Sequence, residues 1–508
     1  MTAPVVDRAS LWWARRDPRH GEGLRRAAPS ELPGHAEVLV VGAGLTGIAT
    51  AVLLARAGRS PVVVEARVAG SGTTGSSTAK ASLLQGSVLQ RLQRHTGPDV
   101  VSAYVRANRV GQLWLREVVT THDLPWQERQ GVTYAVTPEG ARSVEREAEV
   151  ARRAGLPVVD LEDAGLPFPV LAAIGLPGQF QFDPLDVVDA LRADLREHGG
   201  TLVEGAGVSE MSWTRPWRVT TAAGEVVADH VVLATQYPVP DRGMYFARLR
   251  AERSYAAAYR VQAPDALPVG MYLSVDSPAR SVRTAPDPDG DLLVVGGNGH
   301  ETGRGGSTLA RAADLDDWAR RHFPVTTAVC SWSAQDYRTA RQVPSVGAVP
   351  GTNGTLLAAT GFDKWGMTNA VAAAHVLVGD LLGDPPEYAA GLRSTGASPA
   401  DLAASVRHNG SVGVRWVTDR AARLLPTSAR PEPADGEGWV EGGALGPTAV
   451  STDGGRTCRV SAVCPHLAGI VSWNDAERSW DCPLHGSRFA ADGTRLEGPA
   501  TSDLPHRD

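Results

Sequence analysis

The stretch AEVLVVGAGLTGIATAVLLARAG, residues 36–58, decides the fold. Its apolar run Val38–Val41 is typical of a buried parallel strand. Three glycines with the spacing G-x-G-x-x-G come next, and an alanine- and leucine-rich helix is predicted over 48–57. The glycines are Gly42, Gly44 and Gly47. A strand, this glycine turn and a helix in that order predict the start of an α/β dinucleotide-binding fold.

Each glycine has its own physical task in such a turn. Gly42 allows the tight turn, Gly44 lets a pyrophosphate approach the backbone, and Gly47 lets the helix pack closely on the strand. The helix presents bare N–H groups to the diphosphate. Glu65 ends a second predicted strand, PVVVEAR (61–67), where its carboxylate accepts hydrogen bonds from ribose hydroxyls and disfavours the 2′-phosphate of NADP. The alternative is a glycine-rich turn that binds no ligand.

The composition of the 508 residues is that of a globular protein of about three domains. A net charge of −6 argues against a nucleic-acid partner, which would require a basic face. No uncharged apolar run reaches the roughly 20 residues of a membrane span. The N-terminal residues contain no apolar core of a signal peptide, so we expect a cytoplasmic location. The four cysteines would stay reduced there, as thiols or metal ligands.

The rest of the chain divides by composition. Residues 1–35 are expected to form an arm that docks on the body through Trp12 and Trp13. Strands and helices mix between about 111 and 335, with further strands at 230–235 and 291–297. A helix over about 399–424 and the Pro- and Gly-rich PTSARPEPADGEG predict a linker that ends near 440. Residues 441–508 have the short segments and many turns of a small all-β domain.

Several segments resemble the D-amino-acid oxidase/glycine oxidase family of FAD enzymes. They are SGTTGSSTAK (71–80), TQYPVPDRGMYFARLRAERSY (235–255), CSWSAQDYRTARQVPSVGAV (330–349) and ATGFDKWGMTNAVAAAHVLVGDLLG (359–383). The resemblance implies an α/β FAD-binding Rossmann-type domain with an interleaved α+β substrate domain, within residues 36–400. The FAD-binding parts would be about 36–110, 175–240 and 336–400, and the substrate-domain parts about 111–174 and 241–335.

The same resemblance assigns FAD contacts beyond the glycine motif. A late turn would bring a helix N-terminus to the flavin ring, where its dipole stabilises the negative charge of the reduced flavin. Val208 would bracket the adenine with its backbone. The implied contacts are Thr74, Thr78, Lys80, Val208, Gly361, Gly366, Met367 and Thr368.

Lys80 and Lys364 are the two lysines of the chain, and both fall in the segments assigned to the flavin. Arginine supplies almost all other basic charge, so these positions indicate roles that arginine cannot fill, such as contacting the flavin edge or accepting a substrate proton. The alternative is two ordinary surface lysines.

Substrate residues are suggested by the family and by position. In the resembled family an arginine over the flavin often binds a substrate carboxylate, and here Arg280 and Arg283 lie on a predicted strand. We expect Arg283 to be catalytic beside the two lysines, although a surface arginine is the alternative. Tyr255 and Tyr259 would line the site or belong to the core, and His300 would lie in a loop near it.

The C-terminal segment AVCPHLAGIVSWNDAERSWDCPLHGSRF contains two mixed pairs of ligands. Cys464-x-His466 is followed after 15 residues by Cys482-x-x-His485. A [2Fe–2S] cluster of the Rieske type takes two thiolates on one iron and two imidazoles on the other. This pattern strongly resembles a Rieske domain, and the resemblance places Ser487 at a cluster sulfur. Zinc remains the alternative, although its sites usually pair like ligands.

The other two cysteines and the two positions where many Rieske domains have a disulfide remain to be interpreted. Cys330 and Cys458 have no partner at ligand spacing, so we expect structural thiols. Many Rieske domains carry a disulfide between their two loops; here the corresponding positions are Gly469 and Leu484. We therefore expect packing and hydrogen bonds alone to hold the cluster loops.

The combination of FAD and a Rieske cluster predicts an enzyme that connects two-electron and one-electron chemistry. We expect a dehydrogenase-like oxidation of an amine or amino-acid-like substrate by hydride transfer to the flavin, with electrons leaving through the cluster. A one-electron carrier protein is the expected partner, and neither nucleic acid nor a membrane span is expected. The alternative is an electron-transfer protein or reductase in which the cluster feeds the flavin.

Overall fold

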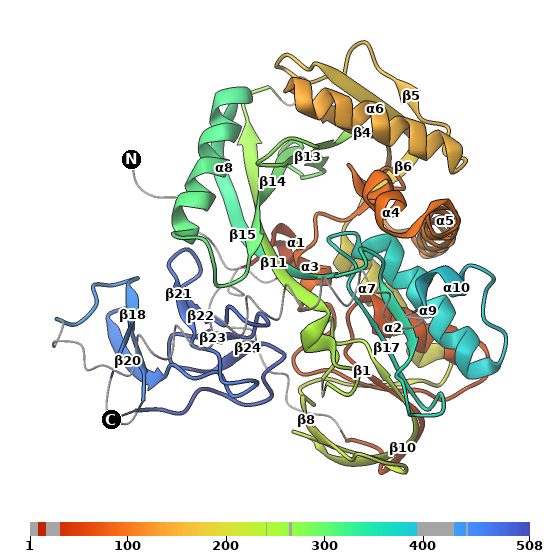
Figure 1. Cartoon of the computed structure of the whole chain (residues 1–508), viewed down its shortest axis with the longest axis vertical. Coiled ribbons are helices and arrows are strands. Elements are labelled where there is room, and N and C mark those ends of the chain that lie inside the picture. Colours follow the sequence, from red (N-terminus) through yellow and green to blue (C-terminus); the bar gives the residue numbers. More distant parts are fainter. Residues whose placement is uncertain are drawn as a thin grey trace.

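The computed structural model describes residues 9–16, 31–239, 241–263, 267–393, 431–442 and 446–507. Two large sheets lie within the first 393 residues, and two small sheets form the C-terminal part (Figure 1). The predicted order of an α/β domain, an interleaved α+β domain and a small all-β domain is confirmed. The helix expected over 399–424 and the first part of the linker lie outside the described residues.

The first sheet is built around the predicted strand, which extends over β1 (His35–Val41). β1 lies between two parallel neighbours, with Val41 opposite Leu233 on one side and Val64 on the other. Burial on both sides explains its continuous apolar run. The strand order is β16-β17-β10-β1-β2-β7, with β9 and β8 added beside β10. The other strands are β2 (Val62–Val64), β7 (Thr201–Val203), β8 (Val208–Met211), β9 (Trp217–Thr221), β10 (Gly224–Leu233), β16 (Ser345–Ala348) and β17 (Leu356–Thr360).

Helices pack beside this sheet and beside one another. α2 (Leu45–Arg56) follows the glycine turn, and its N-cap residue is Gly44, which has no side chain to bond the first N–H groups of the helix. α9 (Gly366–Leu382) packs on α2 and on α5 (Pro98–Thr121). A Cβ atom at Gly111 of α5 would lie 2.1 Å from the Thr368 carbonyl oxygen, so glycine there allows the two helices to approach. The remaining helices near this sheet are α3 (Thr73–Ser76), α7 (Pro184–Glu197) and α10 (Ala389–Leu392).

The second sheet has the order β15-β11-β14-β13-β12-β4-β6-β3, with β5 beside β6. Its strands come from distant parts of the chain, as interleaved domains require. β6 crosses the boundary expected near residue 175. The strands are β3 (Lys80–Ala81), β4 (Trp126–Ala135), β5 (Val159–Asp160), β6 (Ala172–Phe182), β11 (Leu249–Val261), β12 (Met271–Ser274), β13 (Arg280–Ala285), β14 (Leu292–Glu301) and β15 (Val325–Thr339). α4 (Val88–Thr96), α6 (Pro138–Arg153), α8 (Thr308–His322) and the short η2 (Tyr245–Ala247) complete this part.

The C-terminal domain has its own small core, which includes Val460, Trp480 and Phe489. Figure 1 shows it beside β11 and β15 of the second sheet. One sheet contains β18 (Gly438–Glu441), β19 (Thr448–Asp453) and β20 (Arg456–Ser461). The other contains β21 (Ser472–Asn474), β22 (Ser479–Asp481), β23 (Arg488–Ala490) and β24 (Arg495–Glu497).

The described part of the expected N-terminal arm packs on the body. It includes α1 (Leu11–Arg16), whose Trp12 is buried against Leu185 and Trp332. The Trp12 indole nitrogen donates a hydrogen bond to the Ser77 carbonyl oxygen at 2.7 Å. Among the described residues, no helix combines the length and the apolar character needed to cross a membrane.

Candidate functional site

A cavity of about 1970 Å³ begins at the carboxyl ends of β1 and β2. This edge of an open α/β sheet is where such folds bind ligands. The cavity continues along β11, β13, β14 and β15 of the second sheet, and the C-terminal domain forms part of its wall. One continuous space therefore touches all three parts of the molecule.

The glycine motif has the geometry expected for a dinucleotide. Gly42 has a φ of +99°, and a Cβ atom at Gly47 would lie 1.9 Å from the Gly42 carbonyl oxygen, so neither position tolerates a side chain. Gly42 and Gly44 line the cavity, whereas Gly47 lies behind them at the helix–strand contact. The N-terminus of α2 therefore opens on the cavity with backbone N–H groups, as a diphosphate requires.

Glu65 lines the cavity at the end of β2. Its carboxylate accepts hydrogen bonds from the backbone nitrogens of Ala43 at 2.8 Å and Arg67 at 3.0 Å. These two bonds fix the carboxylate beside the glycine turn, where the ribose of a dinucleotide would lie.

The segment 71–80 forms the next part of the cavity wall. Thr74 accepts a hydrogen bond from the Leu45 backbone nitrogen at 3.0 Å, and Thr74 and Thr78 both line the cavity. The Ser71 hydroxyl is buried at the cavity and has no hydrogen-bond partner among the described residues. A buried hydroxyl without a partner fits a site whose ligand supplies one.

Lys80 lies at the start of β3, lines the cavity and is only 9% exposed. Its Nζ donates to the Ser281 hydroxyl at 2.5 Å and to the Tyr272 carbonyl oxygen at 3.2 Å. Burial, with a smaller effect from the Arg283 guanidinium, lowers the pKa of Lys80 to about 7. The amine is therefore substantially neutral near neutral pH.

Lys364 also lines the cavity, in a left-handed backbone conformation with a φ of +70°. Its Nζ lies 3.8 Å from a Glu252 carboxylate oxygen, and its side chain is partly exposed. Its backbone nitrogen donates to the carboxylate of Asp336 at 2.5 Å. Burial raises the pKa of Asp336 to about 6, against the two backbone hydrogen bonds that lower it.

The late turn (361–365) and the start of α9 lie on the cavity, and their contacts with FAD stay predictions. Gly361, Gly366 and Met367 line the cavity, and so does Val208 at the start of β8. Thr368 does not: its hydroxyl donates to the Asn108 side chain at 2.5 Å, within the α5–α9 contact.

Of the residues expected near the substrate, some line the cavity and others lie away from it. Tyr255 lines the cavity, but Tyr259 donates to Asp316 on α8, away from it. His300 stacks on the Tyr255 ring, 5.8 Å between centroids, and does not itself line the cavity. Arg280 pairs with Asp314 at 2.6 Å, also outside the lining.

Arg283 lies outside the cavity lining as well, so we revise the expectation that it binds substrate. It is 1% exposed, and its guanidinium donates to the carbonyl oxygens of Thr78, Ala79 and Thr284. These bonds fasten the segment that carries Lys80. Packing against that segment, which the sequence does not reveal, directs the side chain away from the cavity.

The four residues expected to bind a cluster lie on two adjacent loops. Cys464 and Cys482 are hydrogen-bonded to each other through their side chains, and the rings of His466 and His485 are 5.1 Å apart between centroids. A thiol pair and an imidazole pair are thus formed, one member of each from each loop. Among the described residues, no three His, Cys, Asp or Glu side chains are arranged to hold a single metal ion. The two pairs fit the two irons of a [2Fe–2S] cluster.

Backbone contacts and close packing support both loops. Cys464 donates its N–H to the Gly469 carbonyl oxygen, and Cys482 donates to that of Ser487. The Ser487 side chain is hydrogen-bonded to Cys464, and its expected bond to a cluster sulfur stays a prediction. A Cβ atom at Gly469 would lie 2.7 Å from the Leu484 side chain, so the two loops are in direct contact at these positions. Cys330 and Cys458 are buried and form no disulfide.

Two family models match the chain: FAD dependent oxidoreductase over residues 37–379 and Rieske [2Fe-2S] domain over residues 442–507. The chain belongs to the FAD-dependent oxidoreductase family. The predictions of an FAD enzyme and of a cluster-binding C-terminal domain are confirmed. The oxidoreductase binds FAD, and its Rieske domain binds a [2Fe–2S] cluster.

The oxidoreductase is similar to several known proteins. The "putative Rieske 2Fe-2S iron-sulfur protein YhfW" of Bacillus subtilis (strain 168) is 29% identical over 93% of each chain. The structure of glycine oxidase from Geobacillus kaustophilus has a TM-score of 0.60 at 19% identity, covering 72% of this chain and 99% of that one. L-proline dehydrogenase from P. horikoshii has a TM-score of 0.59 at 17% identity, covering 75% and 99%. At these identities the structural similarities establish the fold.

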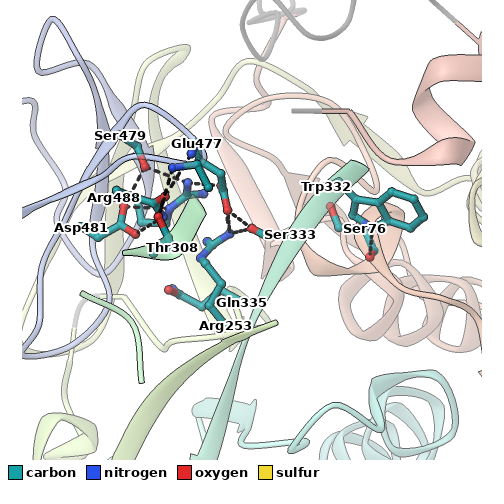
Figure 2. Close-up of polar contacts among 12 residues, drawn as sticks. Ser76, Arg253, Thr308, Trp332, Ser333, Gln335, Glu477, Ser479, Asp481 and Arg488 are labelled. Atoms are coloured by element: carbon teal, nitrogen blue, oxygen red, sulfur yellow. Dashed lines mark hydrogen bonds and ion pairs between the residues drawn. The ribbon is translucent and has the colours of Figure 1, made fainter. Parts of the chain in front are cut away.

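A buried network of charges joins the Rieske domain to residues 37–379, which we call the flavin part (Figure 2). Arg253 of β11 is 1% exposed and lies 3.2 Å from Glu477 and 3.1 Å from Glu497. Arg488 of β23 pairs with the same two carboxylates. Burial alone would raise the pKa of Glu477, but the Arg253 and Arg488 guanidiniums outweigh it and lower that pKa to about 2. Each of the two carboxylates is therefore paired with both Arg253 and Arg488.

Several residues at the site were absent from the sequence-based prediction. Arg67, two positions after Glu65, lines the cavity and donates to the Leu496 carbonyl oxygen of the Rieske domain at 3.2 Å. Its closeness to Glu65 in sequence was an available signal. Asp336 and Gln335 lie within a segment used for the family resemblance, but no local pattern marks them.

Proposed function

We propose that the oxidoreductase is a dehydrogenase that oxidises an amine or amino-acid-like substrate and passes the electrons one at a time through its Rieske domain to a carrier protein. The observation that carries this proposal is the single cavity whose wall includes Lys80, the late flavin turn and the Rieske domain. FAD, when bound, supplies the hydride acceptor, and the cluster supplies one-electron exchange. A cytoplasmic location stays a prediction.

Lys80 is suited to prepare an amine for oxidation. A substrate ammonium ion has no lone pair on nitrogen and must lose a proton before its carbon–nitrogen bond can become a double bond. A neutral lysine has two N–H donors and one lone pair. The two donors have acceptors in Ser281 and Tyr272, so the lone pair is left to accept the substrate proton. The lowered pKa supplies the neutral form.

Arg91 takes the carboxylate role that was expected of Arg283. It lines the cavity from α4, close in sequence to the lining residues Gly86 and Val88. One of its nitrogens pairs with Asp363 at 2.8 Å, and 26% of its side-chain surface stays exposed. A guanidinium with a donor to spare fits the carboxylate of an amino acid.

An anaerobic substrate panel tests the proposal. The purified holoprotein is mixed with amino acids, N-methyl amino acids and simple amines, and the flavin absorbance is followed. We expect one class to bleach the flavin, and Arg91→Met to raise the concentration needed if that class carries a carboxylate. Failure of the whole panel, together with flavin reduction by a reduced carrier protein, would contradict the proposal and establish the opposite direction of electron flow.

A further inference from the structure

One face of β15 carries the contact between the flavin cavity and the Rieske domain. Side chains two positions apart on a strand point to the same face, and Ser333, Gln335 and Tyr337 follow that spacing. Each contacts the Rieske domain: Ser333 bonds Glu477, Gln335 bonds the backbone of Gly486, and Tyr337 bonds that of His485. The last two contacts reach the loop that holds half of the cluster ligands.

Gln335 contacts both the cavity and the loop that carries Cys482 and His485. It lines the cavity, is 2% exposed, and its backbone carbonyl accepts a hydrogen bond from the Thr73 hydroxyl at 2.6 Å. Its side-chain nitrogen donates to the Gly486 carbonyl oxygen at 2.9 Å, and its side-chain oxygen accepts from Thr302 at 2.7 Å. The orientation of the amide is thus determined at both ends.

Tyr337 reaches a cluster ligand directly. Its hydroxyl donates to the backbone carbonyl of His485 at 2.9 Å and accepts from the Gln335 side chain at 3.2 Å. Its ring lies against Tyr237, which also packs on the His466 ring at 5.7 Å between centroids. The His485 ring packs on Phe246 at 6.2 Å between centroids, so both imidazoles face side chains of the flavin part.

Two glycines allow the backbones of the domains to meet. A Cβ atom at Gly486 would lie 2.5 Å from the Ala251 Cβ and 2.9 Å from the Gln335 side-chain nitrogen. A Cβ atom at Gly303, on the flavin side, would lie 2.9 Å from the Pro483 backbone nitrogen. The cluster loop is pressed against the flavin part with no space for a layer of water.

We propose that Gln335 and Tyr337 are positioning residues that hold the cluster loop on the wall of the flavin cavity and form the electron route between the two cofactors. This proposal rests on the proposed function. One electron passes from the reduced flavin to the oxidised cluster, and the second follows when a one-electron acceptor protein has re-oxidised the cluster. Because Arg253 and the two glycines fix the docking, the route needs no movement of the Rieske domain.

Single-turnover electron transfer in the full holoprotein tests the route. A light-driven organic reductant reduces the flavin without any substrate, and cluster absorbance is followed in the wild type, Gln335→Leu and Tyr337→Phe. Tyr259→Phe is the matched control, because it removes a buried tyrosine hydroxyl bonded to Asp316, remote from the cluster loop. Direct reduction of the cluster by the reductant is measured in wild-type protein depleted of FAD and subtracted from every trace.

We expect cluster reduction to be several-fold slower in Gln335→Leu and Tyr337→Phe, with unchanged FAD content, cluster EPR spectrum and midpoint potentials. Rates equal to the Tyr259→Phe control would overturn the proposal. So would slower transfer accompanied by a shifted cluster potential, since driving force would then explain it. If Gln335→Leu loses its cluster, Tyr337→Phe, which lacks one oxygen atom, decides the matter. A wild-type cluster that reduced flavin never reduces would instead contradict the proposed function.

Discussion

Replacing Arg253 by methionine should weaken the docking of the Rieske domain strongly. The guanidinium is 1% exposed and bonds two carboxylates of that domain, Glu477 and Glu497. Removing one partner of a buried ion pair typically costs 3–5 kcal/mol, because the other charge stays buried. Arg488 still neutralises part of the charge, so we expect about 3 kcal/mol, or roughly a 150-fold loss in the docking equilibrium.

Two spectroscopic probes make this loss visible in the holoprotein. Visible circular dichroism of the cluster follows the Rieske domain, and flavin fluorescence follows the FAD-binding part, during denaturant unfolding. We expect the two transitions to coincide in the wild type and to separate in Arg253→Met, with the cluster signal lost first. Arg218→Met is the control, since the exposed Arg218–Glu225 pair should contribute less than about 1 kcal/mol.

A double-mutant cycle with Glu477→Gln assigns the effect to the ion pair. If the charges act together, the double variant should be clearly less destabilised than the sum of the single variants. Coincident transitions in Arg253→Met at the wild-type midpoint would refute the reasoning, because the buried network would then contribute nothing to docking.

Three further outcomes are expected. The rate of flavin reduction by substrate should rise with pH through about 7, because Lys80, with its lowered pKa, is neutral above that value. In stopped-flow measurements, Lys80→Met should lack this rise. If the variant keeps the wild-type pH dependence, Lys80 is excluded as the base. Gly47→Ala should lose most of its FAD in gel filtration with absorbance detection, whereas Gly34→Ala, where a Cβ atom meets nothing within 4 Å, should keep it; equal retention would contradict the packing argument. Ser487→Ala should lower the midpoint potential of the cluster, because a hydrogen bond to Cys464 is lost. An EPR-monitored redox titration measures this potential, and an unshifted value would refute the role of the hydrogen bond.

The features predictable from the sequence are local ones. The turn at Gly42 and the carboxylate of Glu65 depend on neighbouring segments, because a strand, a turn and a helix are consecutive. The residues predicted to bind the cluster are also recognisable, since each loop supplies Cys and His within four positions. In such cases the spacing of residue types is itself the physical requirement.

The contacts between distant segments could not be predicted in this way. Arg253 and Glu477 are 224 positions apart, and the sequence around neither residue indicates a buried ion pair. Arg283 lies on the expected strand, but its guanidinium donates hydrogen bonds to the carbonyl oxygens of Thr78 and Ala79 and does not line the cavity. The role of Gln335 depends on which face of β15 meets the Rieske domain, and only tertiary packing determines that face.

The most direct test of the central claim is a freeze-quench EPR experiment under anaerobic conditions. The oxidised holoprotein is mixed with the compound that bleaches its flavin, and samples are frozen at increasing times. The account predicts that the flavin is bleached first and that a Rieske-type signal then grows at the expense of the reduced flavin. A bleached flavin with no cluster signal at any time would contradict it, because the two cofactors would then not exchange electrons within this chain.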